Sequence, residues 1–251
     1  MKPLAAVKAM SILLLLIPFC NTSVVAQAGI TDTFLYKKAV YNALAVYHQA
    51  IGDQLGLYNG TQYANYSFTF ADGKHPFFNA SAFSAGSIVY DGALYTDIHL
   101  LYDEVAGVLI FQDSMHRLQL HNERVAEFTI LDNHFIRLEK EGLNNDDMPS
   151  GFYQVLYNGT TQVLKREIKT ITQDISSIAV GVVGNVKVKT LYFIKKDNTS
   201  FSIKKENDLF DVFKGRENDL QQYIKVHVLR FKKDIDNTLV QVAAYYDQLT
   251  K

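Results

Sequence analysis

The middle of the chain, residues 57–204, constrains the fold most, because short apolar segments alternate there with two-residue turn signals. The signals are residue pairs that accept the positive φ angles of a type I′ hairpin turn. Strong pairs occur at Asn59-Gly60, Asp91-Gly92 and Asn158-Gly159, and weaker ones at Asp132-Asn133 and Asp197-Asn198. Because a two-residue turn joins only neighbouring antiparallel strands, residues 57–204 are expected to form an antiparallel β-meander.

The segments between these turns are rich in the β-branched and aromatic residues that favour strands. The clearest of them are residues 88–90, 94–102, 108–111, 128–131, 152–157 and 186–194. Their spacing of about 8 to 12 residues predicts roughly ten strands.

Aromatic residues bear on how such a sheet is covered, since the chain contains 15 Tyr and 16 Phe but no Trp. Several expected strands carry large side chains on both faces. In 94–102, Tyr95 and Leu101 fall on one face, and Ile98 and Leu100 on the other. A sheet with two apolar faces must cover both. Helices can cover one face; the other either curls over its own core, as a curved sheet or partly open barrel, or meets a ligand or partner.

Helical patterns flank the β-rich stretch. In residues 33–51, apolar residues recur at steps of four and three, which places them on one helix face: Tyr36, Val40, Leu44, Tyr47 and Ile51. Residues 207–250 predict further helices, beginning with a short one at 207–214 closed by Gly215. Asp236 can cap the last helix, whose apolar face is Leu239, Val242, Ala243, Tyr246 and Leu249.

These zones together predict an α+β fold, with an N-terminal helix, a β-meander and C-terminal helices. No linker rich in Pro, Gly or Ser separates the meander from the last helices. We therefore expect residues 29–251 to form a single domain in which the helices pack on the sheet.

The first 28 residues have the pattern of a secretory signal peptide. Lys2 and Lys8 precede an apolar run at 10–19, and small residues at Ala26 and Ala28 offer two alternative cleavage sites. A membrane anchor would need about 20 apolar residues, and Pro18 interrupts the run. The protein is therefore expected to be exported, to the periplasm or the medium. No later run is long enough to span a bilayer.

Export removes Cys20, the only cysteine, so the mature chain has no disulfide, no thiolate nucleophile and no cysteine metal ligand. The formal net charge of −1 gives no electrostatic basis for binding nucleic acid. The fold must depend on burial of a core.

Three histidines, His99, His116 and His121, fall in consecutive expected strands, with Asp103 nearby. His99 is expected on the strand face that carries Tyr95 and Leu101. If the strands pair, these side chains could approach one another, but no spacing matches a zinc motif. They are interpreted either as half-buried strand histidines or as parts of a histidine and carboxylate site.

Other candidate motifs lack a required part. The acidic run at 144–147 does not have the alternating ligands of a calcium loop. Gly181 and Gly184 are not followed by the Lys-Ser or Lys-Thr of a phosphate loop. No Gly-x-Ser-x-Gly segment exists. The sequence therefore predicts no cofactor and no metal.

A pentapeptide occurs twice, as Leu57-Tyr58-Asn59-Gly60-Thr61 and as Leu156-Tyr157-Asn158-Gly159-Thr160. The flanking residues do not extend the match, which favours reuse of a turn over duplication.

The chain resembles a group of uncharacterised exported bacterial proteins. The resemblance lies in the stretch from Gly86 to Asp103, in Gly151-Phe152-Tyr153 with its Asn-Gly pair, and in the terminal Tyr245-Tyr246-Asp247-Gln248-Leu249. It implies a bacterial cell-envelope setting and no known activity.

Two functions are compatible with these observations. The favoured hypothesis is a non-enzymatic envelope protein that binds an apolar ligand or a protein partner through its aromatic sheet. The alternative is an envelope hydrolase with a site built from His99, His116 or His121 and neighbouring carboxylates.

Overall fold

The structure is a computed structural model that describes residues 38–40, 42–43, 46, 56–113, 115–139, 148–174 and 182–250. The expected signal peptide, the acidic run at 144–147 and Gly181 lie outside the described residues. In the expected helix at 33–51, residues 38–40, 42, 43 and 46 are helical. The other residues of that segment also lie outside the described residues.

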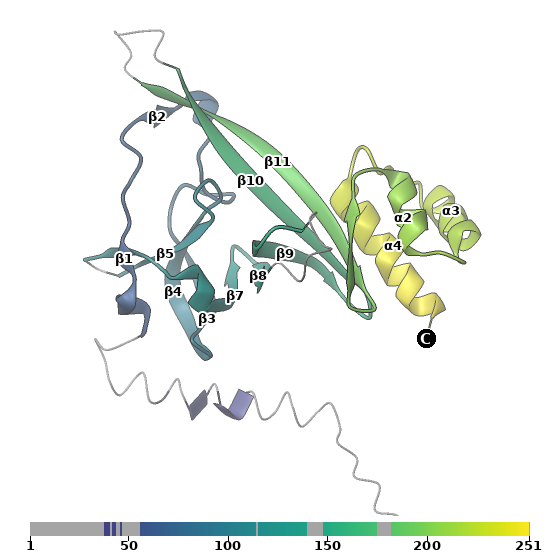
Figure 1. Cartoon of the computed structure of the whole chain (residues 1–251), viewed down its shortest axis with the longest axis horizontal. Helices are drawn as coiled ribbons and strands as arrows, with labels where there is room; N and C mark the ends of the chain where they lie inside the picture. The colour runs from purple at the N-terminus through teal and green to yellow at the C-terminus, as the bar shows by residue number, and fades with distance from the viewer. Residues whose placement is uncertain are drawn as a thin grey trace, which may run out of the picture.

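The described residues form a sheet of twelve strands followed by three α-helices (Figure 1). The strands are β1 (Thr61–Gln62), β2 (Thr69–Phe70), β3 (Ser84–Tyr90), β4 (Ala93–Asp103), β5 (Val108–Gln112), β6 (Arg117–Gln119), β7 (Val125–Ile130), β8 (Asn133–Leu138), β9 (Gly151–Asn158), β10 (Gln162–Asp174), β11 (Val183–Lys196) and β12 (Thr199–Ile203). The helices are α2 (Glu206–Val212), α3 (Glu217–Val226) and α4 (Ile235–Leu249), and short 3-10 turns are η2 (Gly56–Asn59), η3 (Ala71–Gly73) and η4 (Asn122–Arg124).

The strand order confirms the predicted α+β fold with an antiparallel, meander-like sheet. The order is β1-β6-β5-β4-β3-β7-β8-β9-β10-β11-β12, and β2 adds a short parallel pairing to β11. The sheet curves without closing into a barrel. Three connections, β1–β2, β2–β3 and β6–β7, do not join neighbouring strands, and in the last of them β7 pairs with β3 rather than with β6. The turn η4 carries the chain back, and its Arg124 forms an ion pair with Asp91 in the β3–β4 turn.

Positive φ angles confirm two of the predicted hairpin turns. Asp91 and Gly92, with φ of 50° and 76°, join β3 to β4. Asp197 and Asn198, with φ of 49° and 60°, join β11 to β12. The β7–β8 turn lies one residue earlier than predicted, because Leu131 rather than Asn133 takes the positive φ.

Of the other two strong turn signals, the one at Asn59-Gly60 was wrong as a hairpin tip, whereas the one at Asn158-Gly159 marks the β9–β10 hairpin but not a two-residue turn. Asn59 ends the 3-10 turn η2. Asn158 stays in β9 and pairs with Gln162 across a longer link. In that link the carboxylate of Asp247, from α4, accepts a hydrogen bond from the Thr161 backbone N–H at 3.0 Å. A contact with a distant helix therefore helps to set the conformation of this link.

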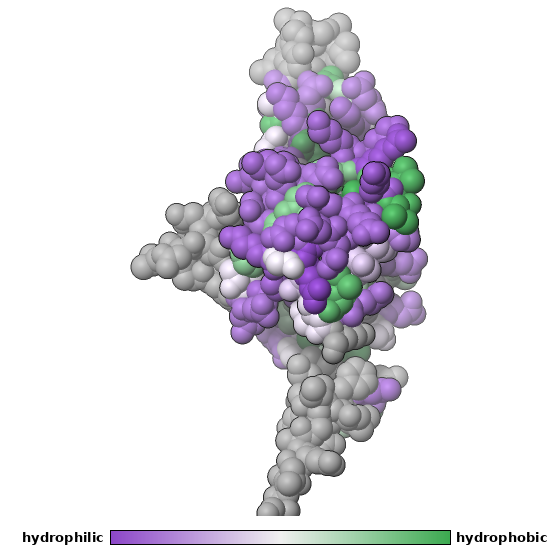
Figure 2. Space-filling view, turned by 90° about the vertical axis from the view of Figure 1, so that its right-hand side faces the viewer, coloured by the Kyte–Doolittle hydropathy of each residue, from purple (hydrophilic) through white to green (hydrophobic). Residues whose placement is uncertain are grey.

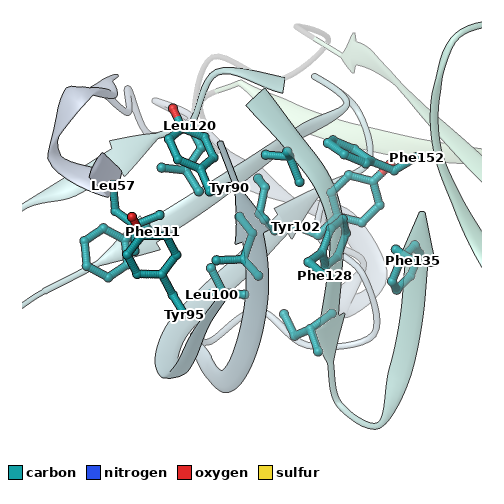
Figure 3. Packing of buried hydrophobic residues seen from close by; sticks show 14 of the residues in the cluster. Leu57, Tyr90, Tyr95, Leu100, Tyr102, Phe111, Leu120, Phe128, Phe135 and Phe152 are labelled. Carbon is teal, nitrogen blue, oxygen red and sulfur yellow. The ribbon is translucent and has the colours of Figure 1, made fainter. Parts of the chain in front are cut away.

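The main core lies on one face of β3, β4, β5, β7, β8 and β9 and is strongly aromatic. Figure 3 shows Tyr102, Phe128, Phe135 and Phe152 packed together. Phe128 and Phe135 stack with ring centroids 4.7 Å apart, and Tyr102 meets Phe152 edge-on at 5.8 Å. On this face, the sheet covers its apolar side chains by curling over them.

The three helices pack on the sheet, as predicted, but only at one end of it (Figure 1). The buried face of α4 meets residues near the ends of β10, β11 and β12 in a second core: Leu239, Val242, Ala243, Tyr246, Val163, Ile194 and Ile203. The helices therefore leave the outer face of β4, β5 and β6 to be covered by another segment.

The cap of α4 was predicted wrongly. The capping residue is Asp234, whose carboxylate accepts a hydrogen bond from Asn237 N. Asp236 instead faces the sheet, where it lies 3.0 Å from Lys165 Nζ and accepts a hydrogen bond of 2.5 Å from the Tyr192 hydroxyl. It links the first turn of α4 to β10 and β11.

A long hairpin of β10 and β11 runs from the helices to the opposite end of the sheet, where β2 lies (Figure 1). There the Phe68 and Phe70 rings lie against Gly184. A Cβ atom at Gly184 would come within 2.6 Å of the Phe68 ring. The close approach of backbone and ring requires glycine at this position.

Candidate functional site

The outer face of β4–β6 is covered by an aromatic segment, residues 61–83, which we call the arm. It contributes Tyr63, Phe77 and Phe83 to a third, smaller hydrophobic cluster with Leu101 and Ile110 of the sheet. The arm thus covers the face that the helices do not reach.

A β-bulge decides which side chains of β4 point toward the arm. Asp97 has a φ of 56°, and the pairing with β3 shifts by one residue at this position. Tyr95 is therefore buried in the main core with Leu100, and not on the face of His99 and Leu101 as predicted. The extra residue of a bulge reverses the alternation of faces beyond it.

A cleft of about 540 Å³ lies between the arm and the sheet. Its apolar walls come mainly from Tyr63, Phe77 and Phe83 of the arm and Leu101 of β4. The sheet also contributes the polar side chains His99, Gln112 and Arg117. Aromatic walls with a few convergent polar groups are typical of small-molecule sites, whose volumes are roughly 300–1,000 Å³.

The strand register places the polar side chains of the cleft in one row. His99 of β4 pairs with Gln112 of β5, which pairs with Arg117 of β6. Residues directly opposite on neighbouring strands lie on the same face of a sheet. Two residues along the strands, Leu101 pairs with Ile110. The sheet side of the cleft therefore has a polar row beside an apolar one.

Asp103 holds the arm in place. It is completely buried, and its Oδ2 accepts hydrogen bonds of 2.9 Å from the hydroxyls of both Tyr63 and Tyr66. Its Oδ1 accepts two more, from the backbone N–H groups of Val105 and Ala106. Burial and the Asp103 carboxylate raise the pKa of the Tyr63 hydroxyl, which stays protonated. Asp103 is therefore a structural anchor.

The three candidate histidines do not meet. Only His99 lies in a strand and lines the cleft. His116 contacts Asp113 in the β5–β6 turn, at 3.3 Å, and His121 lies 3.1 Å from the backbone oxygen of Asn59. In the part of the chain that the structure describes, no three His, Cys, Asp or Glu side chains group as metal ligands would.

A buried charge cluster behind the arm was missed by sequence reasoning. Lys169 Nζ, on β10, lies 3.0 Å from Glu104 Oε2 and donates a hydrogen bond of 2.6 Å to the backbone oxygen of Phe77. A longer contact of 3.3 Å joins it to the backbone oxygen of His75. Burial raises the pKa of Glu104 to about 7, and burial together with Lys169 lowers the pKa of His75.

This cluster positions one wall of the cleft. Phe77 lines the cleft, and its backbone oxygen is held from behind by Lys169. Glu104 and Lys169 lie far apart in the sequence and belong to no recognisable motif. The alternation of β10 gives no signal that Lys169 points inward, so single-sequence reasoning could not find the pair.

The chain matches no protein-family model, no curated protein and no solved structure. Within the described residues, no helix is both long enough and apolar enough to cross a membrane.

Proposed function

We propose that this chain is an exported cell-envelope protein that binds an apolar small molecule in the cleft between the arm and the sheet, without chemically changing it. Residues 1–28 act as the export signal in this proposal, and the mature protein resides in the periplasm or the medium. The observation that carries the proposal is the aromatic cleft of about 540 Å³.

The lining of the cleft favours binding over hydrolysis. The described residues that line it include one histidine, His99, and no carboxylate. A general base needs a partner within hydrogen-bond reach to orient it. The Asp103 carboxylate, on β4 beside the cleft, is occupied by two tyrosines and two backbone groups.

The location of the cleft favours a small molecule over a protein partner. The cleft is bounded by the arm, whereas the helical end of the molecule lies away from it (Figure 1). Figure 2 shows that this end is covered mostly by hydrophilic residues, with hydrophobic ones in separate patches. A stable protein interface has a core depleted of charged residues. The helical end lacks that character in this view.

Binding can be tested with an uncharged fluorescent probe, N-phenyl-1-naphthylamine. Ala82 is exposed and lines the cleft, so Ala82→Trp adds an indole ring at its wall that should obstruct binding. Ala126, exposed on β7 and outside the cleft lining, gives the matched control Ala126→Trp. We expect saturable binding by the wild type and Ala126→Trp, and at least about tenfold weaker binding by Ala82→Trp. Absence of binding, or equal binding by all three, would contradict the proposal.

Export is tested separately by N-terminal sequencing of the protein recovered from outside the cytoplasm. The expected first residue is Gln27 or Gly29. Recovery of the chain with Met1 intact would contradict the proposed signal.

A further inference from the structure

Arg117 brings a positive charge to the cleft. Its guanidinium carbon lies 5.5 Å from the centre of the Phe83 ring. One N–H contacts Asn65 Oδ1, at the long distance of 3.5 Å. Among the described residues, no carboxylate forms an ion pair with it. Because a guanidinium has five N–H donors, most of this donor capacity faces solvent or the cleft.

Gln112 lies beside Arg117 in the polar row, with its side-chain oxygen buried. In the described part of the molecule, that Oε1 atom has no hydrogen-bond partner. Buried acceptors without partners are uncommon in folded proteins. Because a carboxylate also accepts hydrogen bonds, Gln112 can contribute to an anion site only through its amide N–H groups, which donate.

The polar row and the apolar row beside it determine how such a ligand would be oriented in the cleft. Its charged end belongs at Arg117, on the polar row with His99 and Gln112. Its apolar part belongs on Leu101 and against the rings of the arm. The Tyr63 hydroxyl is bound to Asp103, so the ring is left to contact the ligand by its apolar surface.

We infer that the ligand of the cleft is an amphiphile with one carboxylate head, which Arg117 holds, and an apolar body, which the arm covers. This inference rests on the proposed binding function and adds the chemical class of the ligand. A carboxylate fits the planar fork of a guanidinium with two parallel hydrogen bonds. An alcohol of the same length shares the apolar body but carries no charge for Arg117.

The test compares decanoate with 1-decanol as competitors that displace N-phenyl-1-naphthylamine from the full mature chain. The wild type should bind decanoate about tenfold more tightly than 1-decanol, since a hydrogen bond to a charged group contributes that much. In Arg117→Gln, decanoate should bind about tenfold more weakly and 1-decanol about as before. Lys187→Gln, which removes an exposed lysine of β11 outside the cleft lining, should change neither affinity.

Two further measurements separate charge recognition from a structural effect. Gln112→Glu places a negative charge beside the expected carboxylate and should weaken decanoate but not 1-decanol. Added salt should also weaken decanoate selectively, because an exposed charge pair is screened. Equal affinity for both competitors, or equal weakening of both by Arg117→Gln, would overturn the carboxylate head and leave the cleft as an apolar site. Failure of the probe itself to bind would overturn the proposed function instead.

Discussion

At the scale of the residue, Glu104 shows how burial changes the behaviour of one carboxyl group. It is only 4% exposed, and burial raises its pKa from 4.5 to about 7. The folded state therefore binds this proton more tightly than the unfolded state. The resulting stability is fully present below pH 4.5 and is lost as the pH rises to about 7.

This dependence gives a prediction for Glu104→Gln. The free energy of unfolding of the wild type should fall by up to about 3 kcal/mol between pH 4.5 and 7 because of Glu104. The amide of the variant cannot titrate, so its free energy of unfolding should not show this fall. Urea unfolding across this pH range measures it. Glu123→Gln, at a glutamate whose side chain is 67% exposed, is the control and should keep the slope of the wild type. Identical slopes in all three proteins would refute the role given to Glu104.

Val228 is a second residue whose backbone conformation is informative. It follows α3 with a φ of 54°, in the left-handed region that β-branched residues avoid, and its side chain is exposed. Asparagine tolerates this conformation better. Val228→Asn should therefore raise the free energy of unfolding by about 1 kcal/mol, measured in urea. Val226→Asn, at an equally exposed valine inside α3, should give no gain; a similar gain at both sites would show that hydrophobic exposure, not strain, is the cause.

At the scale of the element, α4 is held by side chains at both of its ends. Asp236 contacts Lys165 and Tyr192 in its first turn, and Asp247 binds the Tyr157 hydroxyl and the Thr161 backbone near its last turn. These contacts fix the helix against β9, β10 and β11 in addition to its apolar face.

The different roles of two neighbouring aspartates can be separated by mutation. Asp236→Ala leaves the part-buried Tyr192 hydroxyl without its acceptor and should lower the free energy of unfolding by about 2 kcal/mol. Asp234→Ala removes only the helix cap and should cost about 1 kcal/mol. Both values come from urea unfolding at neutral pH. If Asp234→Ala lowers the free energy of unfolding more than Asp236→Ala does, the helix cap contributes more to stability than the link between α4 and the sheet.

Among the elements, some turns could be predicted from the sequence and others could not. Hairpin turns were predicted correctly where two adjacent residues must take positive φ, as at Asp91-Gly92 and Asp197-Asn198. The two copies of the repeated pentapeptide fold differently, because they have different surroundings: Leu57 is buried in the main core within a 3-10 turn, whereas Tyr157 lies in a strand at the β9–β10 hairpin and binds Asp247. Local propensity decided the first case and tertiary contacts the second.

The cleft could not be predicted, because it depends on register. His99 was recognised as a candidate, but its neighbours Gln112 and Arg117 are defined only once β4, β5 and β6 are aligned. The bulge at Asp97 also shifts the faces of β4, and no signal in the sequence marks it. A single sequence reveals alternation within a strand but not the pairing between strands.

At the scale of the whole molecule, the long β10–β11 hairpin joins the two ends. Its base carries the helical core, and its far part supports the arm through Lys169 and through the pairing of β11 with β2 (Figure 1). The cleft is therefore bounded by an arm fixed at several points: Asp103 holds Tyr63 and Tyr66, and Lys169 holds Phe77. Such fixed walls favour a pre-formed binding site, which loses little entropy when a ligand binds.

The central claim is that this cleft holds a small apolar molecule, and the most direct test is native mass spectrometry of the protein purified from the cells that export it. The wild type and Ala126→Trp should each carry a small molecule that is released on unfolding, in stoichiometric amounts. Ala82→Trp, with the cleft obstructed, should carry none. If Ala82→Trp retains the same molecule as the wild type, or if the wild type and Ala126→Trp carry nothing, the cleft is not the binding site that we propose.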